Sequence, residues 1–170
     1  GHGDVDVDSH YDLPVIKKSM SQLDSMELVP FKAVFDAGIG SVMIAHLSIP
    51  AIDNTANRAT SISKNNVTDL LRTKMGYQGL TFTDALEMKG VAKYFPDGVI
   101  SVEALIAGND MLCLPASVPE SIEAIKKAIV DKRLSWEDIY AKTKKVLASK
   151  FDLGMNKTQW VDTTNLLADI

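Results

Sequence analysis

The sequence has little cysteine and no long apolar run. Cys113 is the only cysteine among 170 residues, which excludes an intrachain disulfide, and its place in DMLCLP is typical of a buried small apolar side chain. No apolar run approaches the roughly 20 residues that a membrane-spanning helix needs, and the first residues show no signal-peptide pattern. The sequence therefore predicts no membrane span, and cysteine usage leaves the redox compartment open.

The sequence also lacks an excess of positive charge. Its 18 lysines and arginines against 22 acidic residues give a net charge of −4, and the lysines are spread along the expected helices. This balance argues against a nucleic-acid groove and against a polybasic membrane surface. A composition of 46% hydrophobic and 24% charged residues indicates a folded domain, or a part of one, with a core of its own.

Short apolar runs alternate with helical patterns along the chain. Apolar spacing predicts helices over residues 21–37, with Pro30 starting a second segment and Gly38 ending it, and over residues 63–75, 100–108, 117–133 and 135–154. Ser63, Ser117 and Ser135 are the expected N-caps, and Gly76 is expected to close the helix that Ser63 begins. Continuous apolar runs over residues 42–46, 79–85 and 110–115 are typical of strands buried on both faces.

This alternation predicts an α/β fold of parallel βα units with right-handed connections. Three parallel strands leave open edges and too little covering layer, so the expected fold is larger than this chain, which we interpret as a fragment. Residues 155–170 have polar turn chemistry and weak periodicity, and they are expected to form a connector that leaves the domain.

Two chemically active side chains stand where expected strands end. His46 ends the run VMIAH, and Asp84 ends GLTFTDA. A single histidine or aspartate after a strand is more often a turn residue than a functional group. Two of them at equivalent strand ends favour a site, because the loops at the carboxyl ends of parallel strands converge.

The opening stretch GHGDVDVDSH is rich in titratable groups, and three interpretations compete for it. Asp4, Asp6 and Asp8 have the spacing of a calcium loop, but Ser9 stands where glycine is needed and Val15 where a bidentate glutamate belongs. A transition-metal site from His2, Asp4 and His10 is conceivable, although this spacing fits no established ligand pattern.

The third interpretation is an acid/base pair. Asp8 precedes His10 by two residues, so a turn would let its carboxylate accept from one imidazole nitrogen and leave the other nitrogen to move a proton. An imidazole that titrates near neutral pH suits that task.

Four stretches together resemble a known enzyme family. GHGDVDVDSH followed by LP, then ELVPFKAVFDAGIGSVMIAH, MGYQGLTFTDALEMKGV and AGNDMLCLP, are similar in order and spacing to the catalytic (β/α)8 barrel of family 3 glycoside hydrolases. The resemblance covers residues 1–154. These correspond to the C-terminal half of the barrel, including its sixth to eighth strands, so the barrel is incomplete in this chain. The Asp-x-His pair resembles the bacterial β-N-acetylglucosaminidase branch.

The resemblance implies roles for five residues. Asp84 corresponds to the catalytic nucleophile, His10 to the acid/base and Asp8 to its orienting partner. His2, in the Gly-His-Gly turn, and His46, at a pocket-lining position, correspond to substrate-binding residues. The implied reaction is retaining hydrolysis of terminal β-linked N-acetylglucosamine, with no cofactor and no metal, and a peptidoglycan fragment is the favoured source of the sugar.

The resemblance also implies what else the enzyme needs. The partners expected are the carbohydrate substrate and the remaining N-terminal half of the barrel, whose Lys-His pair and other sugar contacts this chain lacks, so the fragment alone is expected to be inactive. The compartment of this bacterial-type enzyme, cytoplasmic or periplasmic, stays open.

Three alternatives remain at this stage. In the first, the parent enzyme is a β-glucosidase or β-xylosidase of the same family, which would not depend on His10. In the second, the chain is a non-catalytic βα module that binds sugar or a partner. Within the enzyme interpretation, Glu87 is a second carboxyl candidate, although its place three residues after Asp84 favours a cap or a salt bridge.

Overall fold

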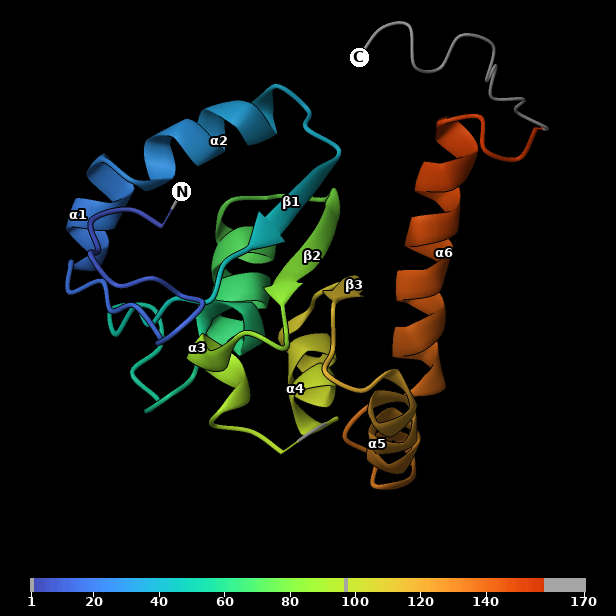
Figure 1. The fold of residues 1–170 in the computed structure, drawn as a ribbon. Coiled ribbons are helices and arrows are strands. Elements are labelled where there is room, and N and C mark those ends of the chain that lie inside the picture. The colour runs from blue at the N-terminus through green and yellow to red at the C-terminus, as the bar shows by residue number, and fades with distance from the viewer. Residues whose placement is uncertain (1, 97, 158–170) are drawn as a thin grey trace, which may run out of the picture.

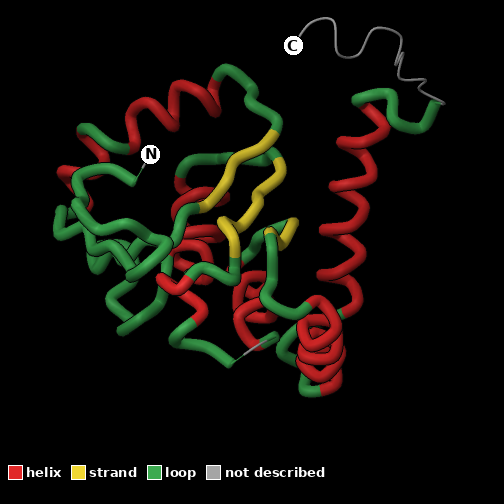
Figure 2. The backbone as a smooth tube through the Cα atoms, viewed as in Figure 1, coloured by secondary structure: helices red, strands yellow, loops and turns green. Residues whose placement is uncertain are grey.

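The computed structural model describes residues 2–96 and 98–157, which surround a parallel sheet of three strands in the order β1-β2-β3 (Figure 1). The strands are β1 (Ser41–Ile44), β2 (Leu80–Ala85) and β3 (Met111–Cys113). Helical segments connect each strand to the next, as Figure 2 shows by colour. The predicted parallel βα arrangement is confirmed, with β1 ending two residues before its apolar run does because pairing with β2 ends at Ile44.

The first helical pattern forms α1 (Met20–Ser25) and α2 (Leu28–Asp36). The second segment begins at Leu28, so Pro30 lies in its first turn, where a missing N–H costs no hydrogen bond. Gly38 ends the pattern as predicted, with a φ of 85° and its N–H donated to the Phe35 carbonyl over 2.9 Å.

The second helical pattern forms a helix, η2 (Asn65–Lys74), and a short 3-10 turn, η1 (Thr60–Ile62), precedes it. The η2 helix has the wide π geometry, and the Met75 N–H continues it by donating to the Leu70 carbonyl over 2.9 Å. The hydroxyl of Ser63 accepts the Asn66 N–H over 3.3 Å, so Ser63 makes the predicted capping contact although the regular helix begins at Asn65.

The remaining helices are α3 (Lys89–Ala92), α4 (Val99–Ala107), α5 (Val118–Val130) and α6 (Trp136–Asp152). Both predicted serine caps are confirmed, since Ser117 accepts the Glu120 N–H over 3.3 Å and Ser135 accepts the Asp138 N–H over 3.1 Å. Among the described residues, no helix has both the length and the apolar character that crossing a membrane requires. The connector after residue 154 stays a prediction, because residues 158–170 lie outside the described part.

The core consists of several buried clusters on and around the sheet. Ile44 and Val67 belong to the cluster between the strands and η2, whereas Val102 and Ala128 belong to the one between α4 and α5. Cys113 is free and only half-buried, which contradicts the predicted burial. The reason is its position at the end of β3, which forms an outer edge of the sheet.

The amino ends of the strands carry a half-buried ion cluster. The Asp110 carboxylate lies 2.7 Å from Arg72 Nη2 and 3.0 Å from Lys145 Nζ. It also accepts the Thr81 N–H over 2.9 Å. Burial raises the pKa of Asp110, but the hydrogen bonds from Thr81 and Lys145 and the charge of Arg72 hold it below its ordinary value. The cluster ties η2, β2 and α6 together at this end of the sheet.

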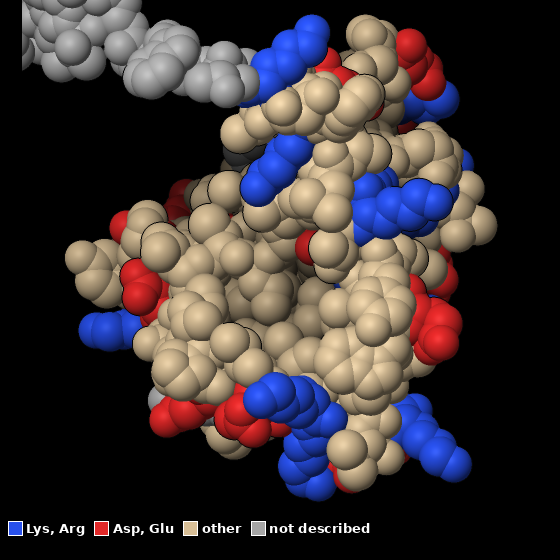
Figure 3. Space-filling model, turned by 90° about the vertical axis from the view of Figure 1, so that its right-hand side faces the viewer, with Lys and Arg blue, Asp and Glu red and all other residues tan. Residues whose placement is uncertain are grey.

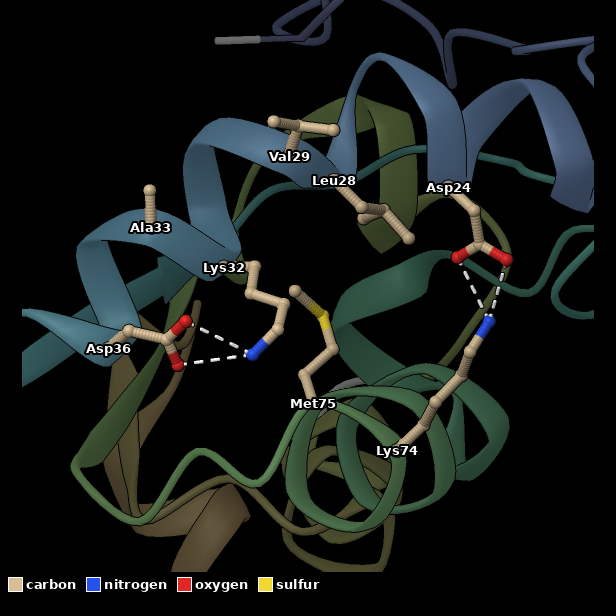
Figure 4. Close-up of a pocket in the computed structure, with 8 residues that line it drawn as sticks. All are labelled: Asp24, Leu28, Val29, Lys32, Ala33, Asp36, Lys74 and Met75. Atoms are coloured by element: carbon tan, nitrogen blue, oxygen red, sulfur yellow. Dashed lines mark hydrogen bonds and ion pairs between the residues drawn. The ribbon is translucent and has the colours of Figure 1, made fainter.

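A groove of about 480 Å³ also lies on the amino-end side of the sheet (Figure 4). It runs between α2 and the end of η2, whose last turns lead into β1 and β2. Lys32 pairs with Asp36 and Lys74 pairs with Asp24 across its rim, as the dashed lines in Figure 4 show. This groove is therefore separate from the carboxyl ends of the strands, where the sequence places the functional residues.

Candidate active site

The N-terminal loop brings Asp8 and His10 together. Asp8 Oδ1 accepts the His10 backbone N–H over 2.9 Å and lies 2.7 Å from His10 Nδ1. Because an ionised carboxylate only accepts, this contact places a proton on Nδ1 and makes Nε2 the working nitrogen of a neutral ring. The hydrogen bonds from the His10 N–H and side chain hold the pKa of Asp8 below its ordinary value. The predicted Asp8–His10 pair is thus present in the structure.

His2 supports the same loop from its start. Its Nε2 lies 2.9 Å from the hydroxyl of Ser9, which is buried. The alternative interpretation of this stretch as a metal site needs His2, Asp4 and His10 together, but Asp4 instead pairs with Lys18 at 3.5 Å. Within residues 2–96 and 98–157, no cluster of three or more His, Cys, Asp and Glu side chains is arranged to hold a metal ion.

Asp84 lies at the carboxyl end of β2, half-buried, where the pairing with β3 is irregular. Phe82 stands opposite Met111 and Ala85 opposite Cys113, so β2 holds one residue more than β3 in this interval. The Thr83 hydroxyl accepts a hydrogen bond from the Cys113 N–H over 2.9 Å, where a regular sheet would have a backbone carbonyl as acceptor. Bulges of this kind re-aim side chains, and Asp84 lies within this one.

His46 follows β1 and is fully buried. Its Nε2 lies 2.9 Å from the Ala85 carbonyl oxygen, and its Nδ1 lies 2.6 Å from the Ser61 hydroxyl. Burial lowers the pKa of His46, against the opposing effects of the Ala85 hydrogen bond and the charge of Asp84. Both ring nitrogens are thus engaged within the protein, and the predicted substrate contact of His46 stays a prediction.

The loop that carries Asp8 and His10 packs on the segment that follows Asp84. Leu13 and Leu86 belong to one buried cluster, together with Val91 of α3. A Cβ at Gly90 would lie 2.6 Å from the Ser9 carbonyl oxygen and 2.8 Å from that of Asp12, so only glycine fits beneath the loop. Lys93 adds an ion pair with Asp12 at 2.6 Å.

The five predicted residues therefore lie at one end of the sheet. His2 and Asp84 lie near enough to His46, and His2 near enough to Asp8, to act on them electrostatically. Among the described residues, no hydrogen bond or ion pair joins His10 directly to Asp84.

Sequence reasoning missed the residues that support this site. Ser61, Thr83 and Asn109 are fully buried and carry hydrogen bonds within it. Their side chains are common at caps and turns, so the sequence offered no signal apart from the place of Asn109 directly before the third apolar run. Glu87, the second carboxyl candidate, is exposed, and its N–H bonds to the Leu114 carbonyl over 3.0 Å.

Comparison with known proteins assigns the family. Residues 1–149 match the family model described as the glycosyl hydrolase family 3 N-terminal domain. The chain belongs to glycosyl hydrolase family 3. Together with the three parallel strands, this shows that the chain is an incomplete part of the family's (β/α)8 barrel, as the sequence predicts.

Relatives within family 3 point to one branch. The chain is 39% identical over 129 residues to a beta-hexosaminidase of Chromobacterium violaceum, covering 76% of this chain and 35% of that protein. It is 35% identical to beta-hexosaminidase A of Pseudoalteromonas piscicida over 69% of this chain and 21% of the relative. The chain thus spans about a third or less of these curated relatives.

Solved structures of family 3 agree. The structure of a beta-N-acetylglucosaminidase from Paenibacillus superposes with a TM-score of 0.90 at 31% identity, covering 97% of this chain and 32% of that one. A beta-glucoside phosphorylase also superposes with a TM-score of 0.86, but at 22% identity it shows the shared fold alone.

Proposed function

We propose that the protein containing this chain is a retaining glycoside hydrolase that removes terminal β-linked N-acetylglucosamine. The observation that carries the proposal is that the Asp8–His10 loop rests on the segment directly after β2, where Leu13 and Leu86 share one buried cluster and Gly90 lies beneath the loop. Retention requires a nucleophile on one face of the anomeric carbon and a proton donor at the leaving oxygen, and these two segments offer one of each. The similarity to beta-hexosaminidases supports the choice of sugar.

In the first step, an Asp84 carboxylate oxygen attacks the anomeric carbon while the bond to the leaving oxygen breaks. That oxygen takes a proton from His10 Nε2, for which His10 enters the step as imidazolium held by Asp8 through Nδ1–H. The products are a covalent glycosyl-aspartate and the released alcohol, with His10 left neutral.

In the second step, His10 Nε2 takes a proton from water, and the water oxygen displaces Asp84 from the anomeric carbon. The sugar leaves with retained configuration, and His10 is again protonated. Asp8 remains a carboxylate throughout, which agrees with the low pKa that its hydrogen bonds from His10 impose. A histidine donor also keeps a second negative charge away from the nucleophile.

The N-terminal half of the barrel supplies the other sugar contacts in this proposal. His2 is assigned to substrate binding at the start of the loop, and the isolated chain is assigned no activity of its own. This division fits the share of relatives that the chain covers.

Turnover of an aryl N-acetyl-β-glucosaminide by the full-length protein tests the proposal. Asp84→Asn should reduce turnover to background, and His10→Ala should slow it by about 10²–10⁴-fold, because each variant removes one of the two reacting groups. Glu87→Gln is the matched control, an exposed carboxyl three residues from Asp84, and should leave the rate unchanged.

Two results would contradict the proposal. Full activity of the Asp84→Asn variant would remove the nucleophile assignment. Faster turnover of the matching aryl β-glucoside or β-xyloside, with no dependence on His10, would assign the protein to another activity of the family.

A further inference from the structure

His46 is a buried group that the proposed reaction leaves without a role. Its Nε2 faces the Ala85 carbonyl, and because a carbonyl oxygen only accepts, Nε2 must carry the hydrogen. Nδ1 then accepts from the Ser61 hydroxyl over 2.6 Å. The two contacts fix one neutral tautomer of a ring that has no exposed surface.

The residue that His46 holds is the neighbour of the nucleophile. The Ala85 N–H donates to Asp84 Oδ1 over 2.8 Å, while the Ala85 carbonyl accepts from His46 over 2.9 Å. Both backbone polar groups of Ala85 are therefore hydrogen-bonded, the N–H to the Asp84 carboxylate and the carbonyl to the His46 imidazole. Movement of the ring would shift the turn that aims the carboxylate.

A further layer of buried hydrogen bonds holds His46 itself. The carbonyl of Ser61 accepts from Asn109 Nδ2 over 2.7 Å, and the same nitrogen bonds to the Ala104 carbonyl over 2.9 Å. The hydroxyl of Thr60 donates to the Ala45 carbonyl over 2.6 Å, which fixes the backbone directly before His46. Asn109 Nδ2 thus bonds to two backbone carbonyls, whereas Asn109 Oδ1 is buried without a hydrogen-bond partner among the described residues.

We propose that His46 is a positioning residue that acts through Ala85 to aim the Asp84 carboxylate at the sugar carbon. The inference rests on the proposed hydrolase function and adds three residues to it: His46 itself, Ser61, which sets the tautomer, and Asn109, which holds Ser61. A neutral ring suits this role, because an imidazolium beside Asp84 would pair with the carboxylate and weaken it as a nucleophile.

Paired substitutions of His46 in the full-length protein separate this role from simple core filling. His46→Gln keeps a donor that reaches Ala85, whereas the shorter His46→Asn keeps only the contact toward Ser61. We expect His46→Asn to lower kcat by roughly 100-fold with KM within about threefold, as for a misplaced reacting group, and His46→Gln to restore activity to within about tenfold of wild type.

Ser61→Ala provides a milder test that keeps the ring. Loss of the Nδ1 partner frees the tautomer, and we expect kcat and the burst rate of aryl alcohol release to fall by about tenfold. Ser101→Ala is the matched control, because Ser101 is equally buried and bonds to the Ser121 hydroxyl over 2.9 Å, away from the site. Its kcat should match wild type.

The outcomes distinguish this inference from the proposed function. Equal kcat in Ser61→Ala, Ser101→Ala and wild type, with Asp84→Asn inactive, would overturn the positioning role and leave the hydrolase intact. A rise in KM alone in His46→Asn would make His46 a substrate contact instead, which also overturns it. Activity in Asp84→Asn would overturn both.

Discussion

At the scale of single residues, two histidines in one site have opposite surroundings. His10 is largely exposed and partnered by a carboxylate, which suits a group that must gain and lose a proton. His46 has no exposed surface and bonds to a carbonyl and a hydroxyl, which suits a group that stays neutral. Environment, rather than residue type, therefore separates the two proposed roles.

Asp8→Ala in the full-length protein should depress kcat by about 100-fold and leave KM within about threefold. Without the carboxylate, the His10 ring samples both tautomers and loses the productive one. Steady-state kinetics on the aryl glycoside measure this, with Asp6→Ala as an exposed control in the same loop. A change in KM alone would show that Asp8 acts on binding rather than on His10.

Stability should fall as the pH is lowered below about 6.5, and His46 should cause part of the decrease. Burial depresses the pKa of His46 below its ordinary value of 6.5, so in this range the unfolded chain binds a proton that the folded protein does not. The loss continues until the pH reaches the lowered pKa of the folded state. Urea unfolding between pH 7 and pH 5 should give a smaller decrease for His46→Gln, and an equal decrease would refute the assignment.

At the scale of elements, the site depends on how one loop rests on one short helix. The 8–12 turn lies directly on α3, where Gly90 leaves room for the carbonyls of Ser9 and Asp12. The bulge near the end of β2 lies five residues before this helix begins.

Gly90→Ala should lower kcat/KM by about 10–100-fold, because the added Cβ meets backbone atoms and must push the loop away from α3. Gly40→Ala is the control, since a Cβ there has nothing within 4 Å. Hydrogen exchange of residues 8–12 should become faster in Gly90→Ala only. Unchanged hydrogen exchange and activity in Gly90→Ala would show that residues 8–12 do not need the space that Gly90 leaves beneath them.

At the scale of the whole molecule, the two ends of the sheet have different tasks. The carboxyl ends gather the titratable groups of the site, and the amino ends gather the Asp110 ion cluster. Helix α6 has no buried residue, and the side of the molecule that it borders is hollowed and mainly uncharged (Figure 3). Open surfaces of this kind fit a barrel that is incomplete in this chain.

Asp110→Ala should lower the free energy of unfolding by about 3 kcal/mol or more, because it leaves Arg72 and Lys145 without their shared anion. Asp131→Ala removes an exposed partner of Lys127 and should cost less than about 1 kcal/mol. Urea unfolding of both variants checks this, and similar midpoints would show that the cluster does not hold α6 to the sheet.

The sequence by itself determined the features that follow local rules. Alternating apolar runs and helical spacing were enough for the parallel βα order, and serine followed by an acidic residue three positions later was enough for the caps at Ser117 and Ser135. The Asp8–His10 pair was also predictable, because a separation of two residues lets one turn close the contact.

Only the tertiary structure decided what depends on residues distant in the sequence. The contact of His46 with Ala85 spans 39 residues, and that of Asn109 with Ser61 spans 48. The bulge in β2 and the wide turns of η2 likewise come from packing against neighbours and not from local preference. A side chain's identity fixes which bonds it can make, but burial and the groups brought beside it decide whether His46 holds a turn or moves a proton.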